Sequence, residues 1–458
     1  MKTALLAATA LGALATATPA QAQHMGHEQH QPAPPPEQKP EPAADHSQMD
    51  HSQHVMPQPA ADEHAGHDMA MTGALGTYPM AREASGTAWQ PDSSEHGGLH
   101  LMSGDWTFMA HGKFDLVYSW QEQPRGDDKV FAAGMLMGMA RRPIGDGTLQ
   151  FKAMLSPDPL MGKRGYPLLL ASGETADGHE PLVDRQHPHD FFMELSGSIS
   201  QNVGQKSSVF LYAGLPGEPA FGPPAFMHRQ SISASPEAPI THHWLDSTHI
   251  TFGVLTAGFV HDNAKIEISR FNGREPDQHR WNIETGPLDS TSIRLSWNPT
   301  SNLALQGSWG HFEDSEQLEP GVDQKRWSAS GTYTRPMTDG YWSTSLSWGR
   351  KTIEGESLDA FALESSLNWK DWTLFSRGEM TENNELVVDH HDDEGDHHGE
   401  AFRVGKISVG LLREFEIAPK LKLGLGGLYA FNFVPGEIEP VYGGDPNGAM
   451  AFVRLKLE

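Results

Sequence analysis

The chain has 458 residues, a formal net charge of −26 at pH 7 and no cysteine. The negative charge excludes nucleic acid and other polyanions as partners, and the lack of cysteine excludes disulfide bonds and thiolate chemistry. A mean hydropathy of −0.49 excludes a helical membrane protein but allows a β-barrel, whose lumen and loops are polar.

The first 22 residues have the pattern of a secretory signal peptide. Lys2 gives a charged start, residues 4–15 an apolar core, and residues 20–22 (Ala-Gln-Ala) a cleavage site. The apolar core is too short to cross a bilayer, and no later stretch of the sequence has about 18 consecutive apolar residues. We therefore expect an exported protein whose mature chain begins at Gln23.

Residues 23–84 have no apolar period and are rich in Pro, Gln, Ala and Glu, so we predict a disordered leader. Imidazole binds Cu(II), zinc and nickel, whereas the thioether of methionine selects Cu(I). A mixture of both without cysteine favours copper ions, held non-covalently, as the cofactor. The alternative is a polar leader that only keeps the precursor soluble. The predicted ligands are His24, Met25, His27, His30, His46, Met49, His51, His54, Met56, His64, His67, Met69 and Met71.

Residues 85–105 are predicted to form an irregular segment that leads into a barrel of residues 106–458. In the barrel, apolar and polar residues alternate with the period of two that a pleated strand shows. Trp327, Ala329 and Tyr333, for example, alternate with serine and threonine. We predict sixteen strands at residues 106–120, 130–141, 148–155, 191–201, 207–214, 250–260, 264–272, 292–297, 303–311, 327–334, 341–349, 361–369, 372–380, 402–415, 420–433 and 449–457.

The connections between the predicted strands alternate between short and long. Residues 298–302, 336–340 and 370–371 are short turns, whereas the links at 313–326, 352–358 and 381–401 are longer. This rhythm, with tryptophans near strand ends, is typical of an outer-membrane barrel. We therefore predict an all-β fold, an antiparallel transmembrane β-barrel of about 16 strands with both ends in the periplasm. A soluble β-sandwich or solenoid also shows alternation but does not predict the alternating connection lengths.

Two external connections, residues 156–190 and 215–249, stand out by their length of about 35 residues each. Both contain apolar stretches, at 166–170 and 221–226, so we expect them to fold inward and constrict the mouth. Jointly, their histidines form a predicted secondary metal site, although loop packing is the favoured explanation for any one of them alone. The acidic run at 389–398 is either a further cation collector or a solvated loop. The predicted ligands in the two connections are His187, His189, His242, His243 and His249.

Side chains of the barrel wall give a further indication. Met135, Met137 and Met139 share one face of the second strand. If that face is luminal, they form a thioether ladder that passes Cu(I); if it faces lipid, they are ordinary apolar cover. Both alternatives stay open. Four charged residues on polar faces are candidates for setting the selectivity of a pore: Arg294, Glu364, Arg377 and Glu379.

The leader resembles a known family. The pentad Asp-His-Ser-Gln-Met at 45–49 and the run at 64–71 are similar to the His- and Met-rich leaders of copper-resistance protein B. Members of that family are outer-membrane barrels encoded with periplasmic copper-handling proteins, so the resemblance implies copper binding and such proteins as partners. Through residues 86–92, 184–190 and 271–277, the barrel resembles a group of uncharacterised proteobacterial outer-membrane proteins. That second resemblance implies no activity.

These features predict an outer-membrane β-barrel with its leader in the periplasm, involved in copper or heavy-metal binding, export or resistance. Its partners would be metal ions and outer-membrane lipid. The alternatives are a porin for an organic solute, with an incidental leader, and a non-transporting surface protein. We expect no enzyme, because Ser247 and His249 are two residues apart on a segment expected to be extended, and no nucleophile elbow or phosphate loop is present in the sequence.

Overall fold

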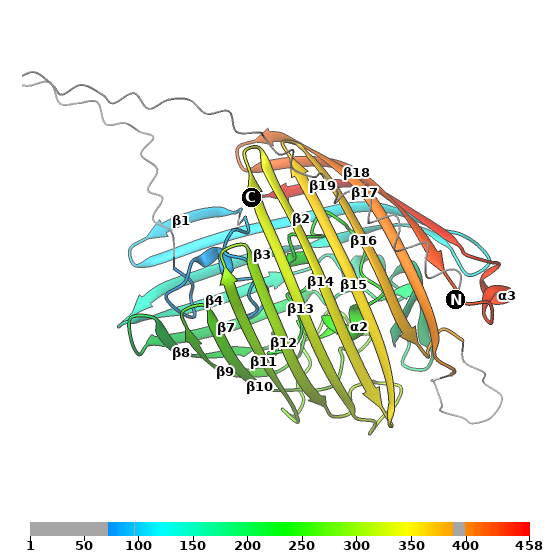
Figure 1. The fold of residues 1–458 in the computed structure, drawn as a ribbon, viewed down its shortest axis with the longest axis horizontal. Coiled ribbons are helices and arrows are strands. Elements are labelled where there is room, and N and C mark those ends of the chain that lie inside the picture. The colour runs from blue at the N-terminus through cyan, green and yellow to red at the C-terminus, as the bar shows by residue number, and fades with distance from the viewer. Residues whose placement is uncertain (1–71, 96, 388–398) are drawn as a thin grey trace, which may run out of the picture. The chain divides into compact units, whose positions relative to one another are not determined.

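The strands of the protein form a closed antiparallel barrel (Figure 1). The computed structural model describes residues 72–95, 97–387 and 399–458. In these ranges sixteen barrel strands follow one another in chain order, and the last pairs with the first to close the ring. They are β2 (Trp106–Gln121), β3 (Asp128–Ile144), β4 (Gly147–Leu155), β7 (Phe192–Asn202), β8 (Ser207–Gly214), β9 (Val254–His261), β10 (Ala264–Phe271), β11 (Ser290–Thr300), β12 (Leu303–Phe312), β13 (Gln324–Met337), β14 (Gly340–Ile353), β15 (Glu356–Trp369), β16 (Trp372–Asn383), β17 (Phe402–Ala418), β18 (Leu421–Phe433) and β19 (Asn447–Leu457).

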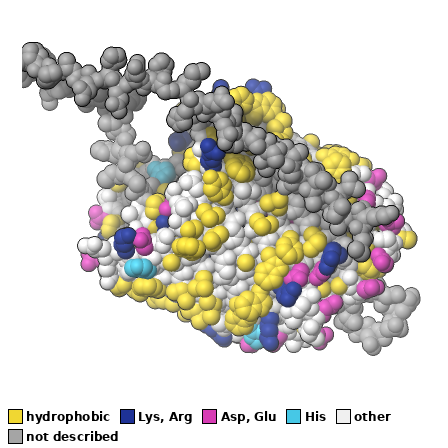
Figure 2. Space-filling view, viewed as in Figure 1, with side chains coloured by type: hydrophobic (Ala, Val, Ile, Leu, Met, Phe, Trp, Pro, Cys, Tyr) yellow, Lys and Arg dark blue, Asp and Glu magenta, His cyan; other side chains and the backbone are white. Residues whose placement is uncertain are grey.

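Alternating side chains explain why these segments form a barrel wall. In β2, Phe114, Leu116 and Tyr118 are 44%, 50% and 44% exposed, whereas Asp115 and Val117 between them are buried. Figure 2 shows hydrophobic side chains spread across the wall. Five of the tryptophans near strand ends lie on this exterior: Trp297, Trp327, Trp342, Trp369 and Trp372.

A barrel wall with apolar side chains outside and polar side chains inside is typical of outer-membrane barrels. The predicted all-β fold, with about sixteen strands, is confirmed. Among the described residues, no helix is long and apolar enough to cross a membrane.

Tight turns join the strands at one end of the barrel. They fall at residues 145–146, 262–263, 301–302, 338–339, 370–371 and 419–420. Most connections at the opposite end are longer. Because tight turns face the periplasm in barrels of this kind, we call the first end periplasmic and the second external.

One predicted external link is wrong. The sequence predicts a long link at 352–358, but β14 runs to Ile353 and β15 begins at Glu356. Glu354 and Gly355 between them have φ values of 49° and 95°, the left-handed backbone of a tight hairpin turn. The reason is that pairing continues beyond the predicted strand ends, so that Arg350 lies opposite Asp359 and Ile353 opposite Glu356.

Residues 72–95, which we call the inner segment, line the inside of the periplasmic end. The carbonyl oxygen of Ala74 accepts a hydrogen bond from Ser200, and that of Gly86 accepts one from Lys152. The sequence assigns residues 72–84 to the disordered leader, but these residues have defined contacts with the barrel wall. That boundary is therefore wrong, because luminal side chains supply partners for a stretch without a pattern of its own. The rest of the predicted leader lies outside the described residues.

Several short elements have no counterpart among the predictions. Strand β1 (Leu99–Ser103) pairs with the start of β2, and β5 (Tyr166–Thr175) and β6 (Pro181–Gln186) form a hairpin between β4 and β7. The short helices are η2 (Met80–Arg82), η3 (Asp158–Met161), η4 (Phe226–His228), α2 (His242–Leu245), η5 (Ser247–His249) and α3 (Glu439–Tyr442).

Candidate functional site

Two long external connections fold into the lumen, as the sequence predicts. The first inward loop is residues 156–191, and the second inward loop is residues 215–253. Leu169 of the first loop and Trp244 of the second are 0% and 1% exposed. The indole nitrogen of Trp244 donates to the carbonyl oxygen of Leu358 on β15, at 3.0 Å. The barrel wall therefore covers the apolar side chains that would otherwise meet water.

Buried charges anchor the second inward loop to the wall. Arg229 donates to Asp246 of the same loop at 2.6 Å and to Glu364 of β15 at 2.7 Å, and all three side chains are buried. Four strands away in the wall, Arg294 of β11 donates to the carbonyl oxygens of Phe221 and Gly222. Arg294 and Glu364, which the sequence indicates as candidates for setting pore selectivity, thus hold a loop in the lumen.

The five predicted histidines of the two inward loops come together inside the barrel, and we call them the histidine cluster. His187 and His189 belong to the first loop, and His242, His243 and His249 to the second. The ring centroids of His189 and His249 are 5.1 Å apart, and those of His242 and His249 are 5.2 Å apart. The centroid of His187 lies 5.7 Å from that of His243.

Groups behind the cluster determine how its rings are turned. Nδ1 of His249 lies 2.6 Å from the carbonyl oxygen of Asp246, which only accepts, so this nitrogen carries the hydrogen. Nδ1 of His189 and of His242 lie 2.8 and 2.9 Å from the carboxylates of Asp158 and Asp246. A histidine whose N–H is held by a carboxylate or carbonyl presents its other nitrogen as a lone pair, as metal-binding histidines do.

Three ring nitrogens in the cluster have no hydrogen-bond partner within the described part of the chain: Nε2 of His189, of His243 and of His249. Burial and the neighbouring His189 and His242 lower the pKa of His249 to about 3. Burial also lowers the pKa of His187 well below its ordinary value. For His243, burial is outweighed by Glu275, which raises the pKa. The lowered pKa values of His187 and His249 favour the neutral ring, which keeps the lone pair that a metal ion requires, whereas the raised pKa of His243 favours the protonated ring.

Gly173 of β5 leaves the space that His243 occupies. Its φ of 106° lies in the region that favours glycine, and a Cβ atom there would lie 2.6 Å from Nε2 of His243. Backbone conformation and close approach therefore both require glycine at this position.

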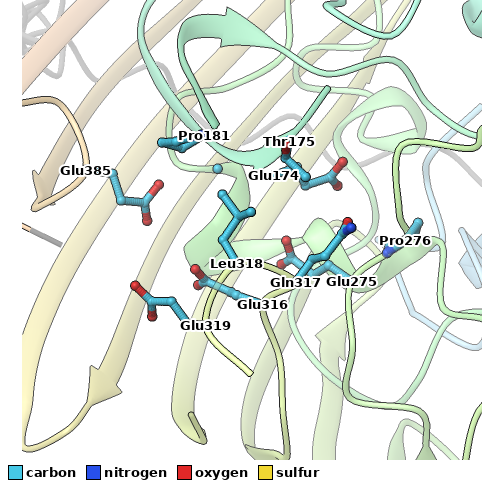
Figure 3. A pocket seen from close by; sticks show the side chains of 11 residues that line it. Glu174, Thr175, Pro181, Glu275, Pro276, Glu316, Gln317, Leu318, Glu319 and Glu385 are labelled. Atoms are coloured by element: carbon cyan, nitrogen blue, oxygen red, sulfur yellow. The ribbon is translucent and has the colours of Figure 1, made fainter. Parts of the chain in front are cut away.

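An acidic pocket of about 30 Å³ borders the histidine cluster. Glu174 contacts Nε2 of His187 at 3.1 Å, and Glu275 contacts Nδ1 of His243 at 3.4 Å. The carboxylates attract cations toward the imidazoles, although Arg280, Arg326 and Lys351 offset part of their charge. Figure 3 shows five glutamates of the pocket arranged around Leu318: Glu174, Glu275, Glu316, Glu319 and Glu385.

The histidine cluster is not a preformed metal centre. In the described ranges, no three His, Asp or Glu side chains stand together as a ready set of ligands. Metal binding at the cluster therefore requires rings to rotate toward a shared ion. The predicted leader ligands, from His24 to Met71, and the acidic run at 389–398 lie outside the described residues.

The nearest candidate for a nucleophile and base does not form a pair. The hydroxyl of Ser247 donates to Glu275 at 3.3 Å and accepts from Arg326 at 3.1 Å. His249 is held by the backbone of Asp246 instead.

A cavity of about 720 Å³ lies at the periplasmic end of the lumen. Met135, Met137 and Met139 line it, whereas Leu136 between them is 54% exposed on the outside. The thioether ladder therefore faces the lumen, which decides between the two alternatives left open by the sequence. His111 and His228, which are not among the predicted metal ligands, line the same cavity. The adjacent pair Met227-His228 in a long apolar connection was the available signal.

The closed ring, the apolar exterior and the inward loops define an outer-membrane β-barrel with a constricted lumen. The sequence matches no family model and no curated protein.

Solved outer-membrane barrels are similar in fold. OmpF of Salmonella typhi, in complex with daunomycin, has a TM-score of 0.49 and 11% identity, over 78% of this chain and 100% of the other. A loop-deletion mutant of OmpT from Vibrio cholerae has a TM-score of 0.44 and 10% identity, over 77% and 99%. An anion-selective porin from Comamonas acidovorans has a TM-score of 0.43 and 11% identity, over 77% and 100%.

Proposed function

We propose that this protein is an outer-membrane barrel that binds transition-metal ions, copper foremost, at the histidine cluster, and that its leader captures the same ions in the periplasm. The observation that carries the proposal is the set of buried, unpartnered Nε2 atoms on His189, His243 and His249. Leaving a buried polar group without a partner costs about 1–3 kcal/mol. Coordination of an ion would recover that free energy.

The chemistry of the ligands favours copper. At nitrogen sites Cu(II) binds more tightly than the other divalent first-row ions, zinc included. The predicted leader ligands add thioethers, which bind Cu(I). The carboxylates of Glu174 and Glu275 contact the rings of His187 and His243. These carboxylates both attract cations to the cluster and orient the two imidazoles. Ion capture by the leader and by the barrel then serves resistance or export.

Titration calorimetry tests this function on the refolded full-length protein. We expect wild type to bind Cu(II) more tightly than Zn(II). The double variant His189→Gln/His249→Gln should weaken Cu(II) binding at the cluster by about 100-fold, the upper end of the 10–100-fold effect of losing even an outer-shell partner. The matched control is His279→Gln, because the His279 side chain is 58% exposed and lies outside the cluster.

The leader is tested separately in the same full-length protein. A variant with all thirteen predicted leader ligands replaced by Gln or Leu should lose copper bound by the leader but keep the cluster isotherm. Identical isotherms for wild type and His189→Gln/His249→Gln would remove the cluster from the proposal.

A porin for an organic solute is the second candidate, favoured by the cavity of about 720 Å³, which lies within the usual range for small-molecule sites. It predicts a conductance that responds neither to metal ions nor to substitutions in the cluster. Bilayer recordings with and without Cu(II) distinguish the two functions.

A further inference from the structure

A row of histidine and methionine crosses the luminal face of three neighbouring strands. His111 of β2 lies opposite Met137 of β3, which lies opposite Met154 of β4. One step along the strands, Lys113 lies opposite Met135. Side chains directly opposite one another on antiparallel strands have Cβ atoms about 4.5–5.5 Å apart. The wall therefore presents an imidazole and several thioethers within contact of one another.

The second inward loop brings matching ligands to this wall. Met227 and His228, in η4, line the same cavity as His111, Met135 and Met137. The ring centroids of His111 and His228 are 6.4 Å apart. The loop and the wall thus converge on one corner of the cavity.

His228 has a free ligand atom. Its Nε2 is buried and has no hydrogen-bond partner among the described residues. Burial, reinforced by His111 and Lys113, lowers its pKa well below the ordinary value. The unpartnered Nε2 faces a cavity that Met137 and Met227 also line.

Packing alone does not account for this arrangement. Methionine is a common filler of irregular cores, and Met154 and Met450 are fully packed in that way. Met135, Met137 and Met227 pack in the same buried cluster, but they also line a cavity that holds an unpartnered imidazole nitrogen.

The charges of this corner select among ions. Lys113 and Lys152 are the nearest luminal neighbours of the row, and Lys152 is itself paired with Glu194 at 3.5 Å. Cationic neighbours disfavour a divalent ion more than a monovalent one. Thioether ligands favour soft ions.

We propose that this corner of the periplasmic cavity is a second site, which binds a soft monovalent cation, Cu(I) in the cell, through the thioethers of Met137 and Met227 and Nε2 of His228. Met135 and His111 complete its surroundings. The site is separate from the histidine cluster and rests on the proposed metal-handling function only for its physiological role.

Silver(I), a soft ion without redox chemistry under these conditions, is the probe. The full-length protein is loaded with Ag(I) in chloride-free buffer and dialysed against free methionine, and the silver retained per chain is counted. We expect Met137→Leu/Met227→Leu and His228→Gln each to retain one Ag(I) fewer than wild type. Leucine conserves the volume of methionine and usually costs less than about 1.5 kcal/mol of stability. The two variants alter different elements, so a folding defect in one leaves the other informative.

The matched control is Met193→Leu/Met450→Leu, which changes two buried methionines that neither belong to the row nor line the cavity and should retain the wild-type count. Equal counts in wild type and both test variants would overturn the second site. Because the leader is present in every variant, its own silver cancels in the comparison. If His189→Gln/His249→Gln loses Cu(II) binding but the test variants retain the wild-type silver count, the histidine cluster is supported and the second site is overturned. If the test variants lose silver but His189→Gln/His249→Gln binds Cu(II) as wild type does, only the cluster is overturned.

Discussion

Replacing Arg229 with alanine is expected to raise the ion conductance of the barrel several-fold. Arg229 is the only partner that joins Asp246 of the second inward loop to Glu364 of the wall in the described ion pairs. Its removal leaves the buried Asp246 without its arginine and Glu364 with Arg377 as its remaining ion-pair partner, and breaking a buried pair in this way costs about 3–5 kcal/mol. At about 1.4 kcal/mol per tenfold change, the balance shifts roughly 100- to several-thousand-fold toward a loop that has left the wall. Water then reaches the lumen.

Single-channel recording in planar bilayers measures this effect. The matched control is Arg350→Ala, because Arg350 and Asp359 form an exposed pair at 2.7 Å and such pairs contribute about 0–1 kcal/mol. Both variants should keep the heat-dependent gel mobility of a folded barrel, since the sixteen-strand ring does not depend on the loop. A conductance for Arg229→Ala equal to that of Arg350→Ala would mean that the loop is held by its apolar contacts instead.

Replacing Glu267 with alanine is expected to release the inner segment. Glu267 of β10 accepts from the Thr87 hydroxyl at 2.6 Å and lies 2.8 Å from Lys265 and 3.1 Å from Arg294. All of these wall side chains are buried. Without the carboxylate, Lys265 and Arg294 are left as neighbouring buried cations, again at a cost of about 3–5 kcal/mol. Departure of the inner segment relieves that cost, because it admits water to both.

Trypsin reports on this release. Arg82 is 6% exposed in the inner segment and is paired with Asp92, so wild type should resist cleavage there. Lys39 is followed by proline, which blocks trypsin, so Arg82 is the first cleavable site of the mature sequence. We expect Glu267→Ala to lose residues 23–82 as one fragment at least about 10-fold faster, with Glu267→Gln in between. Lys206→Ala, which removes an exposed pair with Asp262 at the same end, is the control. A rate no faster than that of Lys206→Ala would show that Glu267 does not hold the segment.

The barrel could be predicted because each strand is recognisable from its own alternating sequence. Alternation such as Phe114, Leu116 and Tyr118 against Asp115 identifies a strand that separates lipid from lumen without reference to any other part of the chain. The same dependence on local alternation explains why the external turn at Glu354-Gly355 was not predicted. Arg350 to Ile353 is polar or charged at most positions, so its alternation is too weak to mark the end of β14.

The histidine cluster was predictable in composition but not in arrangement. His187 and His242 are 55 positions apart, and no spacing in the sequence indicates that their rings lie near each other. The supporting carboxylates are also distant in sequence: Asp158 behind His189 lies 31 positions away in the same loop, and Glu275 behind His243 comes from another connection. Only the folded loops bring ligand and support together.

The inner segment and the thioether ladder could not be read from the sequence for two different reasons. Residues 72–84 have no period, and their order depends on distant wall residues such as Ser200. In β3, both faces are apolar near Met137, with Leu136 and Ala140 on the other side. Without a polar face, the alternation cannot say which side meets lipid.

The pairing of β2 with β19 also has a consequence for biogenesis. This seam joins the beginning and end of the barrel sequence, and Arg454 lies across it from Asp115 at 2.7 Å. The ring therefore cannot be sealed until the last strand has been secreted. Contacts of such sequence separation are slow to form, and until then β2 and β18 are open edges that can pair with another chain. These edges therefore need protection from other chains until the ring closes, and we expect a truncation that removes β19 to leave β2 and β18 open and to promote aggregation.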